Sequence, residues 1–196
     1  MKLKITSLAL ILIVAISSAF APAFKATSYK VDVTKSSLSW IGKKIGGGHN
    51  GTIALKSGIL VLDGKALTGG NFVIDMTTIK DAESSAKLEG HLKADDFFGV
   101  DKFPTSTFVI KKVTAAPAGN VNITGDLTIK GITNPVSFPA DFKVSQDGST
   151  VSAKASIVVD RTKYGIKFRS KSIFPDVGDK LIEDNFELAI ELQAKK

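Results

Sequence analysis

Two histidines, His49 and His91, are the side chains of this sequence best suited to exchange a proton or bind a metal near neutral pH. They lie 42 residues apart and match neither the His-x-His nor the His-Glu-x-x-His spacing of zinc sites. A site would need both to converge with a carboxylate such as Asp95 or Asp96. The absence of cysteine excludes thiol nucleophiles, disulfides and cysteine-ligated metals. We therefore predict no metal and no cofactor, with His49 in a turn and His91 bonded to the backbone.

A cationic segment at residues 161–171 could recognise an anion, because it has five basic side chains and no acidic one. A solvated loop is the favoured interpretation, since runs of like charge usually mark a wet surface. The alternative is a cationic rim that holds an anionic head group at the mouth of a cavity. The candidate head-group residues are Lys43, Arg161, Lys167 and Arg169.

The triple glycine Gly46-Gly47-Gly48 invites comparison with phosphate-binding loops. It matches neither GxxxxGK[ST] nor GxGxxG, and no helix start follows it. A turn between two strands is the better interpretation.

Large apolar side chains form the third candidate set. Ten phenylalanines lie after Phe24. Taken singly, each is expected in a core. Taken together, they could line a pocket for a long apolar ligand. The candidate lining residues are Trp40, Phe72, Ile74, Leu88, Leu92, Phe97, Phe98, Phe108, Ile123, Leu127, Phe138, Phe142, Ile157, Phe168, Phe186 and Leu188.

Most of these residues fall in segments that alternate between apolar and polar side chains. Residues 136–144 and 186–193 show this period of two clearly, which is typical of strands with one buried face. Turn signals recur about every ten residues and indicate antiparallel hairpins. They are Lys56-Ser57-Gly58, Asp63-Gly64, Gly69-Gly70, residues 117–120, Lys130-Gly131, Asn134-Pro135 and Asp147-Gly148.

Residues 82–98 depart from this pattern and predict a short helical insert across one end of the sheet. Antiparallel strands must close on themselves or protect their edges. A barrel of about eight strands does so and can hold one small ligand. A β-sandwich would give the same alternation, so the pattern predicts an all-β domain and leaves these two architectures open.

The first 23 residues have the organisation of a secretory signal peptide. Lys2 and Lys4 precede a short apolar run, and small residues follow it. The run is too short to favour a permanent membrane span, so we predict residues 24–196 as one periplasmic or secreted domain. The net charge of +7 for the whole chain is modest and the sequence has no nucleic-acid-binding module, which argues against a nucleic-acid partner.

Three ordered segments resemble motifs of the YceI-like family. They are HLKADDFFGVDKFPTSTF at His91–Phe108, GDLTIKGITNPV at Gly125–Val136 and DRTKYGI at Asp160–Ile166. The resemblance runs from about Tyr29 to Leu192, and the sequence departs from the family pattern at Ala94, Gly99 and Phe103. It implies a bacterial, exported, lipocalin-like antiparallel β-barrel that binds polyisoprenoids, such as isoprenoid quinones or prenyl pyrophosphates, or other amphiphiles such as fatty amides. It also implies a possible homodimer.

The predicted function is therefore a non-enzymatic lipid-binding or carrier protein. One alternative is a hydrolase or isomerase that acts on a lipid head group with His91 and Asp95 as acid and base. A second alternative is an adhesive or structural β-domain whose interior is filled by side chains. The geometry of His91 and Asp95 and the volume of the interior discriminate among these three hypotheses.

Overall fold

The computed structural model describes residues 26–174, 176, 178 and 181–196, so the predicted signal peptide lies outside the described residues. The described elements are, in chain order, β1 (Thr27–Val31), β2 (Ser37–Lys44), β3 (Gly47–Asp63), β4 (Ala66–Asp81), α1 (Ala86–Lys93), β5 (Thr105–Ala115), the 3-10 helix η1 (Pro117–Gly119), β6 (Val121–Ile129), β7 (Ile132–Val144), β8 (Thr150–Asp160), the 3-10 helix η2 (Arg161–Tyr164) and β9 (Ile182–Lys195).

The strands form a closed antiparallel barrel. The pairing runs β3-β2-β9-β8-β7-β6-β5-β4, and β4 returns to β3 to close the circle of eight strands. The additional strand β1 pairs with residues 59–62 of β3 and with the end of β9, whereas β2 pairs with residues 47–53 of β3. Thus β1 and β2 lie end to end in one strand position. This fold confirms the all-β barrel and resolves the choice between barrel and sandwich.

Alternation along each strand directs one row of side chains inward. On β6, Ile123, Leu127 and Ile129 are buried, as the period of two predicts. Gly125 interrupts this row because a Cβ there would lie 2.5 Å from the ring of Phe108 and from the carbonyl oxygen of Val109. The inward rows of all strands form one contiguous apolar interior.

Three predicted turns were wrong, since Lys56-Ser57-Gly58, Gly69-Gly70 and Asn134-Pro135 lie within β3, β4 and β7. Glycine at position 58 serves close packing instead, because a Cβ there would lie 2.8 Å from both Phe72 and Val31. The turns at Asp63-Gly64, Lys130-Gly131 and Asp147-Gly148 are confirmed. Glycine therefore marked tight packing in the long strands as often as it marked a turn.

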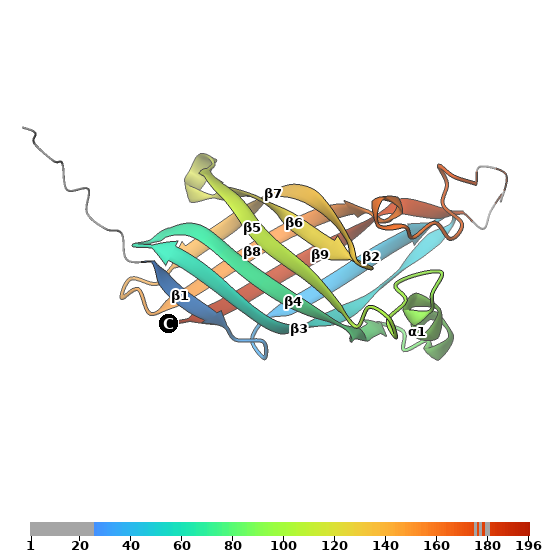
Figure 1. Cartoon of the computed structure of the whole chain (residues 1–196), viewed down its shortest axis with the longest axis horizontal. Helices are drawn as coiled ribbons and strands as arrows, with labels where there is room; N and C mark the ends of the chain where they lie inside the picture. The colour runs from blue at the N-terminus through green and yellow to red at the C-terminus, as the bar shows by residue number, and fades with distance from the viewer. Residues whose placement is uncertain (1–25, 175, 177, 179–180) are drawn as a thin grey trace, which may run out of the picture.

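The predicted helical insert is confirmed as the short helix α1. Ser85 caps its first turn by accepting a hydrogen bond from the backbone N–H of Leu88, and Leu92 is its buried residue. In Figure 1, α1 and the segment that follows β8 lie at the same end of the barrel, while β1 and the C-terminus lie at the opposite end. We call the end with α1 the mouth. In the described part of the chain, no helix is both long and apolar enough to cross a bilayer.

Candidate functional site

Two adjacent chambers occupy the interior of the barrel. The chamber nearer α1, which we call the mouth chamber, has a volume of about 160 Å³, and the inner chamber has about 90 Å³. One water molecule needs only about 10–15 Å³ on this scale. Four residues line both chambers and so form the waist between them: Leu38, Ile74, Leu127 and Leu188. The interior therefore contains two adjacent open spaces and is not filled by side chains.

Fourteen of the sixteen candidate lining residues border this space. Trp40, Leu88, Leu92, Phe97, Phe98 and Phe186 line the mouth chamber, Ile74, Leu127 and Leu188 line both chambers, and Phe72, Phe108, Ile123, Phe138 and Ile157 line the inner chamber.

Phe142 and Phe168 line neither chamber. Phe142 is partly buried against the core beyond Ala140 on β7. The ring of Phe168 lies outside the cavity, edge-on to His91 at a centroid separation of 4.5 Å. Both are large and apolar, which is what composition reveals, but composition does not show where along the barrel or its loops such a residue lies.

Sequence reasoning missed several other lining residues, both aliphatic and small. Strand alternation could have found those that share an inward row with a chosen residue, but the alanines have too little apolar surface to mark a pocket by themselves. The polar Ser106 had no signal in the sequence. The missed residues include Leu38, Ile53, Leu55, Met76, Ile79, Ser106, Ala140, Ala153, Ala155 and Leu192.

The inner chamber is almost entirely hydrocarbon. Lys154 is its one polar lining residue in the described chain, and its ammonium group points outward to Glu191 on β9 at 2.8 Å. This ion pair raises the pKa of Lys154. Lys154 lies between the inward-facing Ala153 and Ala155, so its side chain extends from the outer face of β8 and places no charge in the chamber.

The mouth chamber has polar groups at its border. Lys43 on β2 lines it and pairs with Glu187 at 2.5 Å. Ser106 is 5% exposed, and its hydroxyl has no hydrogen-bond partner. A buried hydroxyl without a partner carries a desolvation cost of about 1–3 kcal/mol. Ser106 is thus poised to bond a polar group that enters the chamber.

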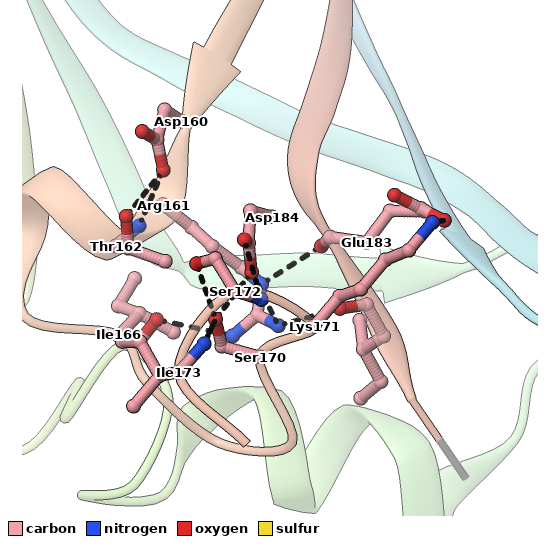
Figure 2. A network of polar contacts seen from close by, with 11 residues as sticks. Asp160, Arg161, Thr162, Ile166, Ser170, Lys171, Ser172, Ile173, Glu183 and Asp184 are labelled. Carbon is pink, nitrogen blue, oxygen red and sulfur yellow. Dashed lines mark hydrogen bonds and ion pairs between the residues drawn. The ribbon is translucent and has the colours of Figure 1, made fainter. Parts of the chain in front are cut away.

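Arg161 anchors the segment between η2 and β9 at the mouth. Its guanidinium donates to the carbonyl oxygens of Glu183 at 3.0 Å, Ile166 at 3.0 Å and Ile182 at 3.1 Å, and the residue is 3% exposed (Figure 2). Burial lowers the pKa of Arg161 while the nearby carboxylates oppose that shift, but an arginine with backbone acceptors stays charged. Most of its donors are therefore committed to the fold.

Asp184 and Ser170 complete this network (Figure 2). The hydroxyl of Ser170, which is fully buried, donates to Asp184 at 2.5 Å, and the backbone N–H of Ser172 donates to the same carboxylate at 3.2 Å. Burial acts to raise the pKa of Asp184, but these hydrogen bonds and the charge of Arg161 lower it overall. The loop after η2 is thus anchored to β9 by buried polar contacts.

The remaining head-group candidates, Lys167 and Arg169, do not border the mouth chamber. They line a shallow hollow on the outer surface together with Asp95, Asp96 and Phe168. Arg169 lies over the ring of Phe168, 5.0 Å from its centroid. The predicted cationic segment therefore divides into a buried structural arginine and exposed cations outside the cavity.

The predicted backbone bond of His91 was wrong. Its Nε2 lies 3.0 Å from the carboxylate of Asp96, and Asp95 binds Lys102 at 2.6 Å. The hydrogen bond and charge of Lys102 lower the pKa of Asp95. Neither His91 nor Asp95 lines the cavity, so this pair lacks the access to a bound head group that the hydrolase or isomerase hypothesis requires.

His49 lies in β3 and not in a turn, and it borders the mouth chamber. Its Nδ1 is 3.8 Å from Asp81, a carboxylate at the end of β4. The two histidines do not converge, because each faces a different acidic residue.

A closed antiparallel barrel around an elongated apolar cavity defines the class of β-barrels that enclose one hydrophobic ligand. The fold is similar to that of Burkholderia cenocepacia BcnA, with a TM-score of 0.65, 22% identity and coverage of 84% of this chain and 99% of that one. The fold is also similar to that of a polyisoprenoid binding domain from Saccharophagus degradans, with a TM-score of 0.65 and 12% identity. That match covers 85% of this chain and 97% of the domain. The match to the Campylobacter jejuni YCEI protein has a TM-score of 0.56 and 21% identity, and it covers 72% of this chain and 82% of that one.

The YceI-like domain model matches residues 29–194, so the chain belongs to the YceI-like family. A UPF0312 protein of Staphylococcus aureus strain USA300 is 44% identical over 85 residues, and one from strain MSSA476 is 42% identical over the same length. Each match spans 41% of this chain and 47% of the relative. The match thus extends over about half the length of these curated relatives.

Proposed function

We propose that this protein is an exported, non-enzymatic binding or carrier protein for a long-chain amphiphilic lipid. The observation that carries the proposal is the two-chambered cavity, apolar along its length and polar at one end. The polyisoprenoid binding domain of S. degradans shares this fold, which supports a polyisoprenoid such as an isoprenoid quinone or a prenyl pyrophosphate as the ligand. A fatty amide is the other amphiphile we propose to test.

The inner chamber would supply affinity without specificity. Its wall offers hydrocarbon and makes no hydrogen-bond demand on the chain that enters it. Burial of apolar surface contributes about 25 cal/mol per Å², so a few hundred Å² gives on the order of 10 kcal/mol before the costs of ordering and association. This gross free energy is sufficient for a carrier.

The mouth chamber would receive the head group. Lys43 and Ser106 are the proposed contacts. Lys43 is an exposed cation that would have to leave its ion pair with Glu187 to meet an anionic head group, and Ser106 offers an unpartnered hydroxyl. Arg161 would act as a positioning residue, because three of its donors already bind carbonyl oxygens. Lys167 and Arg169 have no proposed contact with the ligand.

Trp40 provides a direct test, because it is the single tryptophan of the sequence and it lines the mouth chamber. Titration with prenyl lipids of increasing length should change its fluorescence, and affinity should rise by about 0.8 kcal/mol per methylene until the cavity is full. Native mass spectrometry of protein purified without detergent, followed by organic extraction, should identify a co-purified apolar molecule. A protein that is empty and takes up neither prenyl lipids nor fatty amides would contradict the proposal.

Export and assembly need their own experiments. We propose cleavage after Ala23, which leaves residues 24–196 as the mature, periplasmic or secreted domain. N-terminal sequencing of protein from the periplasmic fraction should then begin at Phe24. We also propose a homodimer, which light scattering during size-exclusion chromatography measures directly.

A further inference from the structure

We propose that His49, Asp81 and Glu83 form a binding site for one divalent transition-metal ion beside the mouth chamber. One nitrogen of His49 and one carboxylate oxygen from each acidic residue lie within 4.8 Å of one another. This site was not predicted from the sequence, which pointed to Asp95 and Asp96 as the carboxylates nearest to a histidine. It does not depend on a lipid ligand.

The strongest support is a buried carboxylate oxygen that lacks a partner. The side chain of Asp81 is 1% exposed, and its Oδ1 has no hydrogen bond, whereas its Oδ2 accepts one from the backbone N–H of Ser85 at 3.1 Å. The nearest cationic candidate is Nδ1 of His49, which lies 3.8 Å from that same Oδ1. A buried carboxylate in this position needs a compensating charge, since desolvation of an unpaired ion is costly.

The nearby lysine does not supply that charge. Lys80 binds Oε2 of Glu89 at 2.9 Å, and Oε1 of Glu89 accepts from the backbone N–H of Asp81 at 3.2 Å. Lys80 and Glu89 therefore satisfy each other on the outer side of the strand end. The negative charge of Asp81 stays directed at His49.

The strands fix two of the proposed ligands relative to each other. Gly51 of β3 pairs with Asp81 of β4, and the carbonyl oxygen of Asn50 accepts from the backbone N–H of Ala82 at 2.8 Å. A side chain at position 51 would collide with the carbonyl oxygen of Lys80, so this close approach requires glycine. His49 and Asp81 are thus set on adjacent, tightly paired strands before any metal arrives.

The donor set fits a transition metal better than magnesium. Imidazole nitrogen suits zinc, copper and nickel, and carboxylate oxygens are accepted by the same ions. Ligands 2.0–2.1 Å from a tetrahedral zinc are about 3.3 Å apart. The three donor atoms, which lie within 4.8 Å of one another, would therefore draw closer when an ion binds, and the exposed Glu83 is the side chain freest to move. Three protein ligands leave a fourth position for water.

Zinc titration of the tag-free, chelator-stripped full chain tests the site. Isothermal titration calorimetry should show one equivalent of zinc bound. Glu83→Gln or His49→Gln should weaken zinc binding at least 10-fold, because loss of a residue that only supports a metal ligand already costs about that much. Glu83→Gln is the decisive variant because residue 83 is exposed and its substitution leaves the fold intact. Asp81→Asn tests the buried ligand and is interpreted only if circular dichroism shows a folded protein.

The second histidine provides a matched control. His91 also faces a carboxylate, that of Asp96, and His91→Gln should bind zinc as the unmodified chain does. With only two histidines in the sequence, NMR can follow each ring, and Co²⁺ should shift the His49 signals far more than those of His91. No zinc binding, equal binding by Glu83→Gln, or equal loss in His91→Gln would overturn the proposal.

Discussion

The two chambers of the barrel differ in what their walls can recognise. The inner chamber presents hydrocarbon from every strand that reaches it, and its single lysine directs its charge away to Glu191. In addition to apolar side chains, the mouth chamber is bordered by Lys43, Lys44, His49, Ser106, Arg161, Glu183 and Asn185. The inner chamber can thus select a ligand by the length of its apolar chain, and the mouth chamber can select it by its polar group.

The difference arises from how each end is closed. Around the inner chamber, regular strand pairing satisfies the backbone, so the side chains that face inward need no polar partners. At the mouth, α1 and the loop after η2 leave regular pairing, and buried polar side chains must satisfy their carbonyl and N–H groups. Polar character at the mouth is therefore partly a structural requirement, and the experiments below separate that requirement from ligand recognition.

The largest effect is expected when the mouth loses its structural arginine. Arg161→Met should lower the free energy of unfolding by about 3–5 kcal/mol, because it leaves three backbone carbonyls and Asp184 without their buried partner. Urea denaturation measures the loss. The control Lys167→Met removes an exposed cation and should change stability by less than about 0.5 kcal/mol. Equal effects would show that the network in Figure 2 is not what anchors this end.

A second effect should appear when the inner chamber is shortened. Ala155→Phe places a ring in that chamber and should exclude about three methylenes of a long ligand. At about 0.8 kcal/mol for each methylene, the affinity for that ligand should fall by about 2.4 kcal/mol, or about 50-fold. Ligands three carbons shorter should bind with unchanged affinity in the Trp40 fluorescence titration. Ala189→Phe, on the exposed face of β9, is the matched control. A uniform loss for all chain lengths would argue that the inner chamber does not measure length.

Acid should weaken the mouth network selectively. The pKa of Asp184 is lowered from its ordinary value of 3.8, so its stabilisation is complete above that value and is lost as pH falls through the lower, folded-state pKa. We expect Asp184→Asn to cost about 1.5 kcal/mol at pH 7, and this difference from the unmodified protein should shrink below pH 3.8. Urea denaturation at pH 7, 5 and 3 checks it. A difference that is constant with pH would exclude the charged form as the stabilising species.

The smallest effect concerns the unpartnered hydroxyl. Ser106→Ala should weaken an amphiphile that bonds this group by about 1 kcal/mol, or about 5-fold, and leave a plain hydrocarbon of equal length unaffected. Without ligand, the variant should be at least as stable as the unmodified chain, because it removes a buried hydroxyl that makes no hydrogen bond there. Ser156→Ala on the outer face of β8 is the control. An equal change for both ligands would remove Ser106 from head-group recognition.

Alternation made the barrel and most of its apolar lining predictable. Phe138, Phe186 and Leu188 were placed correctly because the direction of a strand side chain follows from its parity. Parity says nothing about depth along the barrel, so it could not separate Phe142 from Phe138 on the same strand. The choice between barrel and sandwich also lay beyond a local pattern, because it depends on whether β2 and β9, which lie far apart in the chain, pair with each other.

The polar features of the mouth were predictable in part only. Lys43 and Arg161 were chosen for their charge. The sequence could not show that the guanidinium of Arg161 donates hydrogen bonds to carbonyl oxygens of residues five to twenty-two positions away. Asp81 gave no signal either, since its partner His49 lies on the neighbouring strand, 32 residues earlier. Such contacts depend on strand register, which the irregularities between β3 and β4 shift several times.

The position of β9 has a consequence for how the molecule folds. This strand lies between β8 and β2 and also pairs with β1, so two seams of the barrel form only with residues 182–195. The pair Ser37 and Glu191 joins positions 154 residues apart. Contacts of such separation form slowly, and until then the edges of β2 and β8 are open to pairing with other chains. Closure of the barrel should therefore be the late step in folding, and the interval before it is when this chain is most exposed to aggregation.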